Sequence, residues 1–292
     1  MAISEHSRRV ELHYDELTAG YVGNWNPDHI HLGLFEPEDV PEDLNRLAES
    51  AGLRRAVERM VDVIAAPAGI RANHRVVDAG CGVGGTAIYL ANQRGCAVTG
   101  VNVNRKQLGI ARQKATDAGV ADRVRFEYAD CSEHLPFKDG SVDSVINIES
   151  ACHYGDRGTF LREVFRILTP GGRIAAMDWM ARDDLSAEEY EQHILPLCKP
   201  WVVSPLERQS TYTSLLSGAG FEVVEFEGFS GRDAENVRLI GHRYRQLSLY
   251  WLAGVNTPEL GRLIQRMRLL HRVWSEGFFE LRRYCAKKPE DG

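Results

Sequence analysis

Between residues 75 and 180, five short apolar runs alternate with stretches whose apolar residues recur at helical spacing. The runs read "RVVDAG", "AVTGVNV", "VRFEYAD", "VDSVINIES" and "RIAAMDWM". Strand-like runs separated by helices favour a parallel sheet whose connections are right-handed crossovers. This alternation predicts an α/β fold, with ligands expected beyond the carboxyl ends of the strands.

The regions on either side of this core have different sequence patterns. Residues 1–74 mix short helical patterns with aromatic turns, which predicts an N-terminal helical cap. Residues 181–292 place helical patterns around two late strand-like runs, "GFEVVEFEGF" and "FFELRRYCAKK". We therefore expect a cap (1–74), a core (75–180) and a third region (181–292) that holds an inserted helical lid and the final strands of the core sheet.

Composition narrows the function classes. A chain of 292 residues, 43% hydrophobic and 26% charged, is ordinary for a globular protein, and a formal net charge of −6 does not indicate a nucleic-acid surface. No window approaches ~20 apolar residues, so no membrane span is expected. The six cysteines form no CxxC pair, which predicts free thiols in a reducing cytoplasm and no structural metal.

A glycine-rich loop, "DAGCGVGG", follows the first apolar run at residues 78–85. Its glycines let the chain turn sharply out of a strand and bring bare backbone against a ligand. The helix that follows points its amide ends, which carry partial positive charge, at the same place. The loop alone does not choose the ligand, because dinucleotide-binding proteins share it.

Residues at the ends of the strands narrow the choice of ligand. Asp78 can accept hydrogen bonds from loop amides or from a ligand's ammonium group. The second run ends at "GVNVNRKQ", where a ribose-binding side chain would lie, and the third ends at Asp130, which can accept from an adenine amino group. "LTPGGR" predicts a turn at Pro170–Gly172 before the fifth strand.

In this order, "DAGCGVGG", "ADCSEHLPF" and "LTPGGR" resemble the class I S-adenosylmethionine-dependent methyltransferases, over residues 75–180. The resemblance implies a Rossmann-like, seven-stranded, mostly parallel sheet whose last strand is antiparallel. It implies S-adenosyl-L-methionine as cofactor and S-adenosyl-L-homocysteine as product. The cofactor-binding residues it implies, with neighbouring polar side chains added, are Tyr14, Asp78, Gly80, Cys81, Gly82, Asn102, Asn104, Gln107, Asp130, Cys131 and Asn147.

One position departs from the family's pattern. Where many members carry an acidic residue for the ribose hydroxyls, this chain has Asn102. An amide can both donate and accept, so ribose binding is still expected, without a charge-assisted bond. Gln107 is either a second polar contact or an exposed helix residue.

The segment "NIESACHY" after the fourth run offers Glu149, His153 and Tyr154. It resembles the corresponding region of sterol and isoprenoid C-methyltransferases, where an acidic residue after this strand is associated with deprotonating a carbocation. A site for that chemistry should be dry and aromatic, with one positioned base. Two other interpretations stay open: Glu149 caps the following helix, or His153 is a core histidine bonded to backbone.

Aromatic residues in "HYDELTAGYVGNW" recur at helical spacing, with Tyr14, Tyr21 and Trp25 on one face. In the related C-methyltransferases a comparable leading helix closes over the cofactor; ordinary core packing is the alternative. Tyr21 is expected at the reacting centre. The residues expected around the substrate are Tyr21, Trp25, Tyr154 and Trp179. His29 and His31 lack a third ligand candidate and are not interpreted as a metal site.

These residues predict a C-methyltransferase that acts on the alkene of an isoprenoid or prenylated natural product. Glu149, directly or relayed by His153, would take the proton from the carbocation, unless the cation cyclises. An O- or N-methyltransferase of a small secondary metabolite, with His153 as base, stays open, as does a non-catalytic regulator that binds the cofactor.

The expected partner is an apolar small molecule, and the N-terminal segment is expected to join subunits into a homo-oligomer. In the lid, Arg243 and Arg245 either bind a diphosphate or belong to a solvated helix face.

Overall fold

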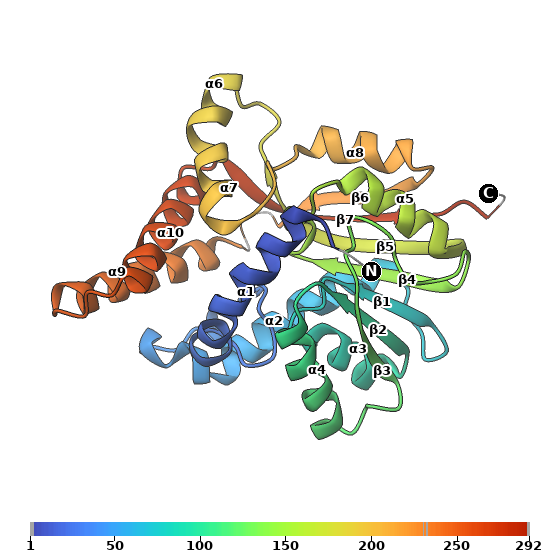
Figure 1. Ribbon diagram of the computed structural model, residues 1–292, viewed down its shortest axis with the longest axis horizontal. Coiled ribbons are helices and arrows are strands. Elements are labelled where there is room, and N and C mark those ends of the chain that lie inside the picture. Colours follow the sequence, from blue (N-terminus) through green and yellow to red (C-terminus); the bar gives the residue numbers. More distant parts are fainter. Residues whose placement is uncertain (1–2, 230, 232, 291–292) are drawn as a thin grey trace.

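Seven strands form one sheet, in the order β3-β2-β1-β4-β5-β7-β6 (Figure 1). The computed structural model describes residues 3–229, 231 and 233–290. The strands are β1 (Arg75–Ala79), β2 (Ala97–Asn102), β3 (Val124–Tyr128), β4 (Val142–Ile148), β5 (Leu168–Ala181), β6 (Glu222–Gly228) and β7 (Phe279–Lys287). Only β7 runs antiparallel to its neighbours, β5 and β6. The predicted mostly parallel sheet with an antiparallel last strand is confirmed.

Helices cover both faces of the sheet, which explains why its central strands are almost continuously apolar. One face carries α2 (Ala51–Ala65), α3 (Gly85–Arg94) and α4 (Arg105–Asp117), and the other carries α5 (Arg157–Ile167) and α8 (Gln209–Gly218). Successive residues of β1 point to opposite faces, so Val76 packs in the first cluster and Val77 in the second. The apolar clusters on the two faces of the sheet therefore both hold the strand ends in place.

The Pro170–Gly172 segment does not form the predicted turn before the fifth strand. It lies inside β5, where Gly171 adopts a φ of +78° and the pairing with β4 shifts register. The Gly171 N–H donates to the Lys288 carbonyl oxygen, and the Lys288 N–H donates to that of Gly172, both at 2.9 Å. These bonds to the residue after β7 hold the segment in the sheet.

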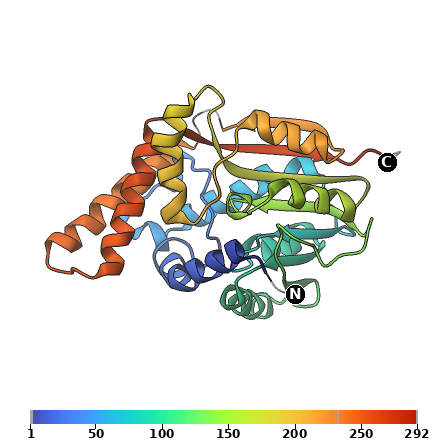
Figure 2. The same cartoon turned by 45° about the horizontal axis from the view of Figure 1, so that its top comes forward.

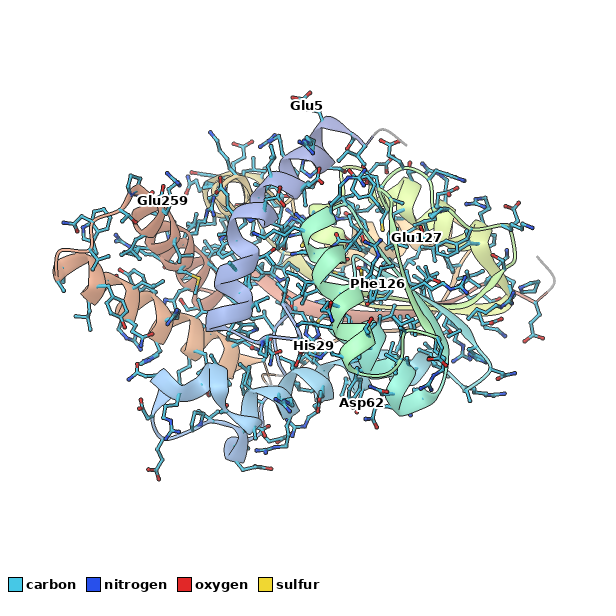
Figure 3. All side chains as sticks on the ribbon, turned by 60° about the horizontal axis from the view of Figure 1, so that its bottom comes forward. Glu5, His29, Asp62, Phe126, Glu127 and Glu259 are labelled. Carbon is cyan, nitrogen blue, oxygen red and sulfur yellow. The ribbon has the colours of Figure 1, made fainter. Side chains whose placement is uncertain are left out.

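The N-terminal region covers the carboxyl ends of the strands. Its first helix, α1 (Glu5–Asn24), begins at the N-cap Ser4, whose side chain accepts the Ser7 N–H. Three short 3-10 segments follow, η1 (Pro37–Asp39), η2 (Leu44–Glu49) and, after α2, η3 (Ala66–Ala68). Figure 3 shows α1 alongside α4, where the Asn104 side chain donates to the Glu11 carbonyl oxygen.

Two helical insertions extend the fold beyond the sheet. Between β5 and α8 lie α6 (Ala187–Glu189), the π-helical η5 (Tyr190–Ile194) and α7 (Leu195–Trp201), and between β4 and α5 lies η4 (Ala151–His153). Between β6 and β7, α9 (Ala234–Leu252) and α10 (Pro258–Ser275) pack as a hairpin that projects away from the sheet (Figures 1 and 2). This hairpin lies within the third region that the sequence predicts, and we call it the lid.

Within the described ranges, no helix combines the length and the apolar character that a membrane crossing requires. All six cysteines are buried and unpaired.

Candidate active site

A cavity of about 320 Å³ lies at the carboxyl ends of β1, β2 and β4, beneath α1 and the lid. This edge of a parallel sheet is where α/β proteins bind their ligands. The predicted site residues that line it are Tyr14, Tyr21, Trp25, Asp78, Gly80, Cys81, Gly82, Asn102, Gln107, Asp130, Cys131, Glu149, His153, Tyr154 and Trp179. Folding thus brings together residues that are up to 165 positions apart in the chain.

Asn104 and Asn147, predicted at the cofactor, do not line the cavity. Asn104 is the N-cap of α4: its Oδ1 accepts the Gln107 N–H at 2.8 Å, and its Nδ2 donates to α1. Asn147 is fully buried behind the glycine loop, where its Nδ2 donates to the Ala79 carbonyl oxygen at 2.9 Å. The structure therefore assigns both side chains to positioning the cavity wall, because their donors are used within the protein.

The glycines of the loop serve different purposes. Gly80 and Gly82 both have positive φ, at +80° and +52°. A Cβ at Gly80 would lie 2.2 Å from Ser150 Oγ, whereas one at Gly82 would meet only Ile30 Cδ1, at 3.6 Å. Close packing behind the loop thus requires Gly80, and Gly82 leaves open space on the side of the cavity.

Asp78 presents an unsatisfied oxygen at the end of β1. Its side chain is buried, and no partner of Asp78 Oδ2 is found among the described residues. Burial raises the pKa of this carboxyl to about 7, although a hydrogen bond from the Ala87 backbone lowers it in part. An unpaired buried acceptor costs free energy that a ligand's donor would recover.

At the next strand end, amide side chains form a short chain of hydrogen bonds. Asn102 Nδ2 donates to Gln107 Oε1 at 2.7 Å, and Gln107 Nε2 donates to Thr18 Oγ1 of α1 at 3.0 Å. Gln107 is therefore buried in the wall of the cavity and is not the exposed helix residue that the sequence also allowed.

Asp130 lies at the end of β3 with both carboxylate oxygens engaged. Its Oδ1 accepts from Ser132 N and Oγ, at 3.0 and 2.6 Å, and its Oδ2 accepts from Ser4 N and Oγ, both at 3.3 Å. These hydrogen bonds outweigh burial, which acts in the opposite direction, and lower the pKa of Asp130. The carboxylate therefore stays charged, and the start of α1 is tied to this end of the cavity.

Glu149 follows β4 with a φ of +50°, and it lines the cavity. Its Oε1 accepts the Leu32 N–H at 2.8 Å, and its Oε2 accepts Trp179 Nε1–H at 3.1 Å. Burial raises its pKa to about 7 against the effect of these two bonds, and the nearby Asp178 adds to the rise. Because its bonds go to Leu32 and Trp179, Glu149 is not a helix cap: η4 begins after Ser150 without a side-chain cap.

Both ring nitrogens of His153 have partners within the protein. Nδ1 lies 3.0 Å from the Val202 carbonyl oxygen and Nε2 lies 2.9 Å from the Tyr14 hydroxyl. Since a carbonyl only accepts, Nδ1 carries the proton and Nε2 accepts from Tyr14. Burial lowers the pKa of His153 to about 4, so the ring is neutral. This arrangement matches the backbone-bonded core histidine that the sequence left open. The second partner of the ring is the Tyr14 hydroxyl.

Aromatic rings wall the end of the cavity around Glu149. The Trp179 ring stacks on Phe279 with centroids 5.2 Å apart and meets Trp201 edge-on at 6.3 Å. Tyr14 and Tyr21 lie 6.4 Å apart on α1. The buried rings leave a cavity whose wall is mostly apolar at this end.

The histidine pair of the segment before η1 contributes to the wall without a metal site. His29 Nδ1 and His31 Nε2 lie 3.0 Å apart, and both side chains are buried. Among the described residues, no group of three or more His, Cys, Asp or Glu side chains has the arrangement to hold a metal ion.

Comparison with known proteins places this site in a family. Residues 77–176 match a family model described as a methyltransferase domain. Methyltransferase GfsG of Streptomyces halstedii is 35% identical over 77% of this chain and 76% of its own length. The 27-O-demethylrifamycin SV methyltransferase of Amycolatopsis mediterranei is 32% identical over 83% and 87%. The chain is a class I S-adenosylmethionine-dependent methyltransferase.

A solved structure shares the fold of this methyltransferase. The geranyl diphosphate C-methyltransferase of Streptomyces coelicolor A3(2) superimposes with a TM-score of 0.69 at 18% identity, over 98% of both chains. At this identity the similarity concerns the fold alone.

The residues present fit S-adenosylmethionine. The unpaired Oδ2 of Asp78 suits the ammonium group of the methionyl part, and the open side of Gly82 leaves room for it. Asn102 and Asp130 also line the cavity, and we propose that they hold the ribose and the adenine. When bound, the cofactor supplies an electrophilic methyl group on a sulfonium centre.

Sequence reasoning missed several lining residues of this methyltransferase. They are Thr86, Leu32, Trp201, Leu239, Ile240, Leu247, Met267 and Leu270. Most belong to the lid, where helical periodicity marks a buried face without saying what that face covers.

Proposed function

We propose that this methyltransferase methylates an alkene carbon of an isoprenoid or prenylated substrate, and that Glu149 accepts the proton released afterwards. One observation carries the proposal: a single carboxyl group, able to change protonation near neutral pH, faces the aromatic end of the cavity. Of the other acids that line it, Asp78 and Asp130 lie at the cofactor end, and Asp28 pairs with Lys114 at 3.1 Å.

The chemistry requires a base and a shielded cation. The π electrons of the alkene form the new carbon–carbon bond, the bond from the methyl group to sulfur breaks, and a cation is left on the neighbouring carbon. Loss of a proton to Glu149 then restores a double bond. Because water would quench the cation, the aromatic wall of Tyr21, Trp25 and Trp179 favours this outcome.

Aromatic rings also stabilise positive charge through their electron-rich faces. Burial and the charge of Glu149 raise the pKa of Tyr21, so its hydroxyl remains neutral. The rings therefore contribute no competing anion, and the proton has one acceptor at this end of the cavity.

A second candidate is O- or N-methylation of a small secondary metabolite. It is favoured by the name of the rifamycin relative, which describes an O-methylation. Glu149, with a pKa of about 7, suits a hydroxyl proton as well as a carbocation. His153 is a poorer base in either reaction, because both of its ring nitrogens already have partners.

The test is to locate the transferred methyl group. The enzyme is incubated with S-adenosylmethionine carrying a carbon-13 methyl group and a panel of prenylated and hydroxylated compounds. Mass spectrometry then finds products that have gained one methyl, and NMR assigns the atom that carries it. A methyl on carbon supports the proposal, and a methyl on oxygen or nitrogen overturns it in favour of the second candidate. Calorimetric binding of the cofactor without any turnover would favour the non-catalytic regulator.

A further inference from the structure

We infer that Arg243 binds an anionic group of the substrate, a carboxylate or a phosphate ester, on the lid side of the cavity. The inference deepens the proposed function, because it takes the cavity around Glu149 to be the acceptor site. It assigns the substrate to the amphiphiles, with a charged head at α9 and an apolar body that extends toward β4.

Arg243 occupies the centre of the face that α9 turns toward the cavity. Leu239, Ile240 and Leu247 line the cavity from the same helix, at spacings of three and four residues from Arg243. Arg245, two positions on, is exposed. Arg245 therefore belongs to a solvated helix face, which is one of the two sequence interpretations. Arg243 does not, because it lines the cavity.

No carboxylate of the described residues forms an ion pair with this arginine. Its Nη1 donates a hydrogen bond to Gln246 Oε1, at 2.7 Å on the same helix. Burial lowers the pKa of its guanidinium, which nevertheless stays charged. A guanidinium has five N–H donors, so most of its hydrogen-bonding capacity is left for a ligand. An apolar stripe that retains an unpaired cation is best explained by an anion that binds there.

The surroundings of Arg243 add donors and positive charge. His242 also lines the cavity, and its buried Nε2 has no partner among the described residues. The segment 234–275, which forms the lid hairpin, contains seven arginines and two glutamates in a chain whose net charge is −6. The excess of arginine in this hairpin therefore favours an anion on this side of the molecule.

This cation and the base line the same cavity from different elements. Arg243 belongs to the lid, and Glu149 follows β4 at the sheet edge. Side chains of α9 and α10 that line the space beside Arg243, including Leu239, Met267 and Leu270, are apolar. A ligand with a charged head and a hydrocarbon body satisfies both parts of the lining at once.

The experiment compares three ligands that share one apolar body. Binding of geraniol, geranic acid and geranyl phosphate is measured by calorimetry, with S-adenosylhomocysteine present, to the full-length wild type and to Arg243→Gln, Arg243→Lys and Arg245→Gln. We expect wild type to bind at least one anionic ligand about ten-fold or more tightly than geraniol, as for hydrogen bonds to a charged group. Arg243→Gln should lose that preference, Arg243→Lys should keep part of it, and Arg245→Gln, which removes the same charge nearby, should keep it in full.

The anionic ligand that binds more tightly to wild type shows whether the site prefers a carboxylate or a phosphate ester. Equal affinity for all three ligands, a preference that survives in Arg243→Gln, or no binding of any ligand to wild type would each overturn the inference. Thermal unfolding of Arg243→Gln establishes that the variant is folded. Because binding is measured without turnover, this result is independent of whether the methyl group goes to carbon or to oxygen.

Discussion

Glu149 and His153 lie four residues apart, and burial shifts their pKa values in opposite directions. It raises the pKa of Glu149 to about 7 and lowers that of His153 to about 4, because burial disfavours the charged form of either group. Near neutral pH only Glu149 exchanges a proton readily. Its carboxyl is also held in place by two hydrogen bonds, from Leu32 and Trp179.

Replacing Glu149 by Gln should lower the rate of product formation by about 10²-fold or more, the usual contribution of a positioned base. Wild-type activity should rise with pH up to the pKa of about 7 and then level off, since the ionised carboxylate is the active form. Initial rates at saturating cofactor measure both effects, and calorimetry should show that binding of S-adenosylhomocysteine is retained.

Glu163 offers a matched control for that variant. Like Glu149, it accepts a backbone N–H, that of Leu135 at 2.9 Å, but it lies on α5 outside the cavity lining. Glu163→Gln should methylate at the wild-type rate. An unimpaired Glu149→Gln enzyme would remove Glu149 from the reaction.

Gly82→Val should abolish cofactor binding, because the added side chain fills space on the cavity side of the loop. Gly69→Val is the control: Gly69 has a similar φ of +62° and no atom within 4 Å of an added Cβ, but it is not part of the cavity lining. Both variants should lose stability to a comparable degree through backbone strain. Calorimetry with S-adenosylhomocysteine should separate them, and binding by Gly82→Val at wild-type affinity would refute the assignment of the loop.

At the scale of elements, α1 closes the cavity through contacts with three separate parts of the core. Tyr14 bonds to His153, Ser4 bonds to Asp130, and the Asn104 Nδ2 of α4 donates to the Glu11 carbonyl oxygen and to Asp15 Oδ1. These contacts hold the helix in place. Loss of one of them should therefore increase the mobility of the whole helix.

Asn104→Ala should release α1 from α4 and speed amide hydrogen exchange along residues 5–24. Loss of the α4 N-cap should cost about 1 kcal/mol of stability as well. Ser50→Ala, which removes the N-cap of α2, should cost a similar amount without any faster exchange in α1. We also expect Asn104→Ala to bind S-adenosylhomocysteine several-fold more weakly. Unchanged exchange in α1 would show that the helix does not depend on this contact.

At the scale of the whole molecule, buried carboxyls make stability depend on pH. The folded-state pKa values of Asp78 and Glu149, both about 7, exceed their ordinary values. The folded protein therefore holds more protons than the unfolded chain, and the stability that these groups contribute is lost as pH rises toward 7.

The free energy of unfolding of Glu149→Gln, relative to that of wild type, should therefore increase when the pH is raised from about 5 to about 8. The expected increase is on the order of 2 kcal/mol. Chemical denaturation at the two pH values measures the difference, in which the contributions of the histidines cancel. A difference that does not change with pH would show that Glu149 titrates at its ordinary value.

The homo-oligomer stays a prediction, but exposed aromatic side chains of the N-terminal segment no longer support it. The aromatic side chains of α1, Tyr14 and Tyr21, face the cavity of their own subunit and are not available to a neighbour. Light scattering that gives a multiple of 32.7 kDa would support assembly, and a monomeric mass with full activity would exclude the need for it.

The sequence by itself determined the sheet, the glycine loop and the edge where the cofactor residues gather. These features depend on local causes: apolar periodicity, glycine's freedom at positive φ, and the rule that parallel strands end at one edge. Asp78, Gly82 and Asp130 could be named in advance, because each lies at the end of a strand or within three residues of it.

Only the tertiary structure decided what the polar side chains at that edge do. Glu149 is positioned by Leu32, 117 residues away, and His153 is neutralised by burial and bonded to Tyr14, 139 residues away. Asn147 is bonded to Ala79 and is not part of the cavity lining, whereas Arg243 lines the cavity without an ion-pair partner among the described residues. Protonation and hydrogen bonding depend on burial and on partners from distant segments, and a local pattern carries no information about either.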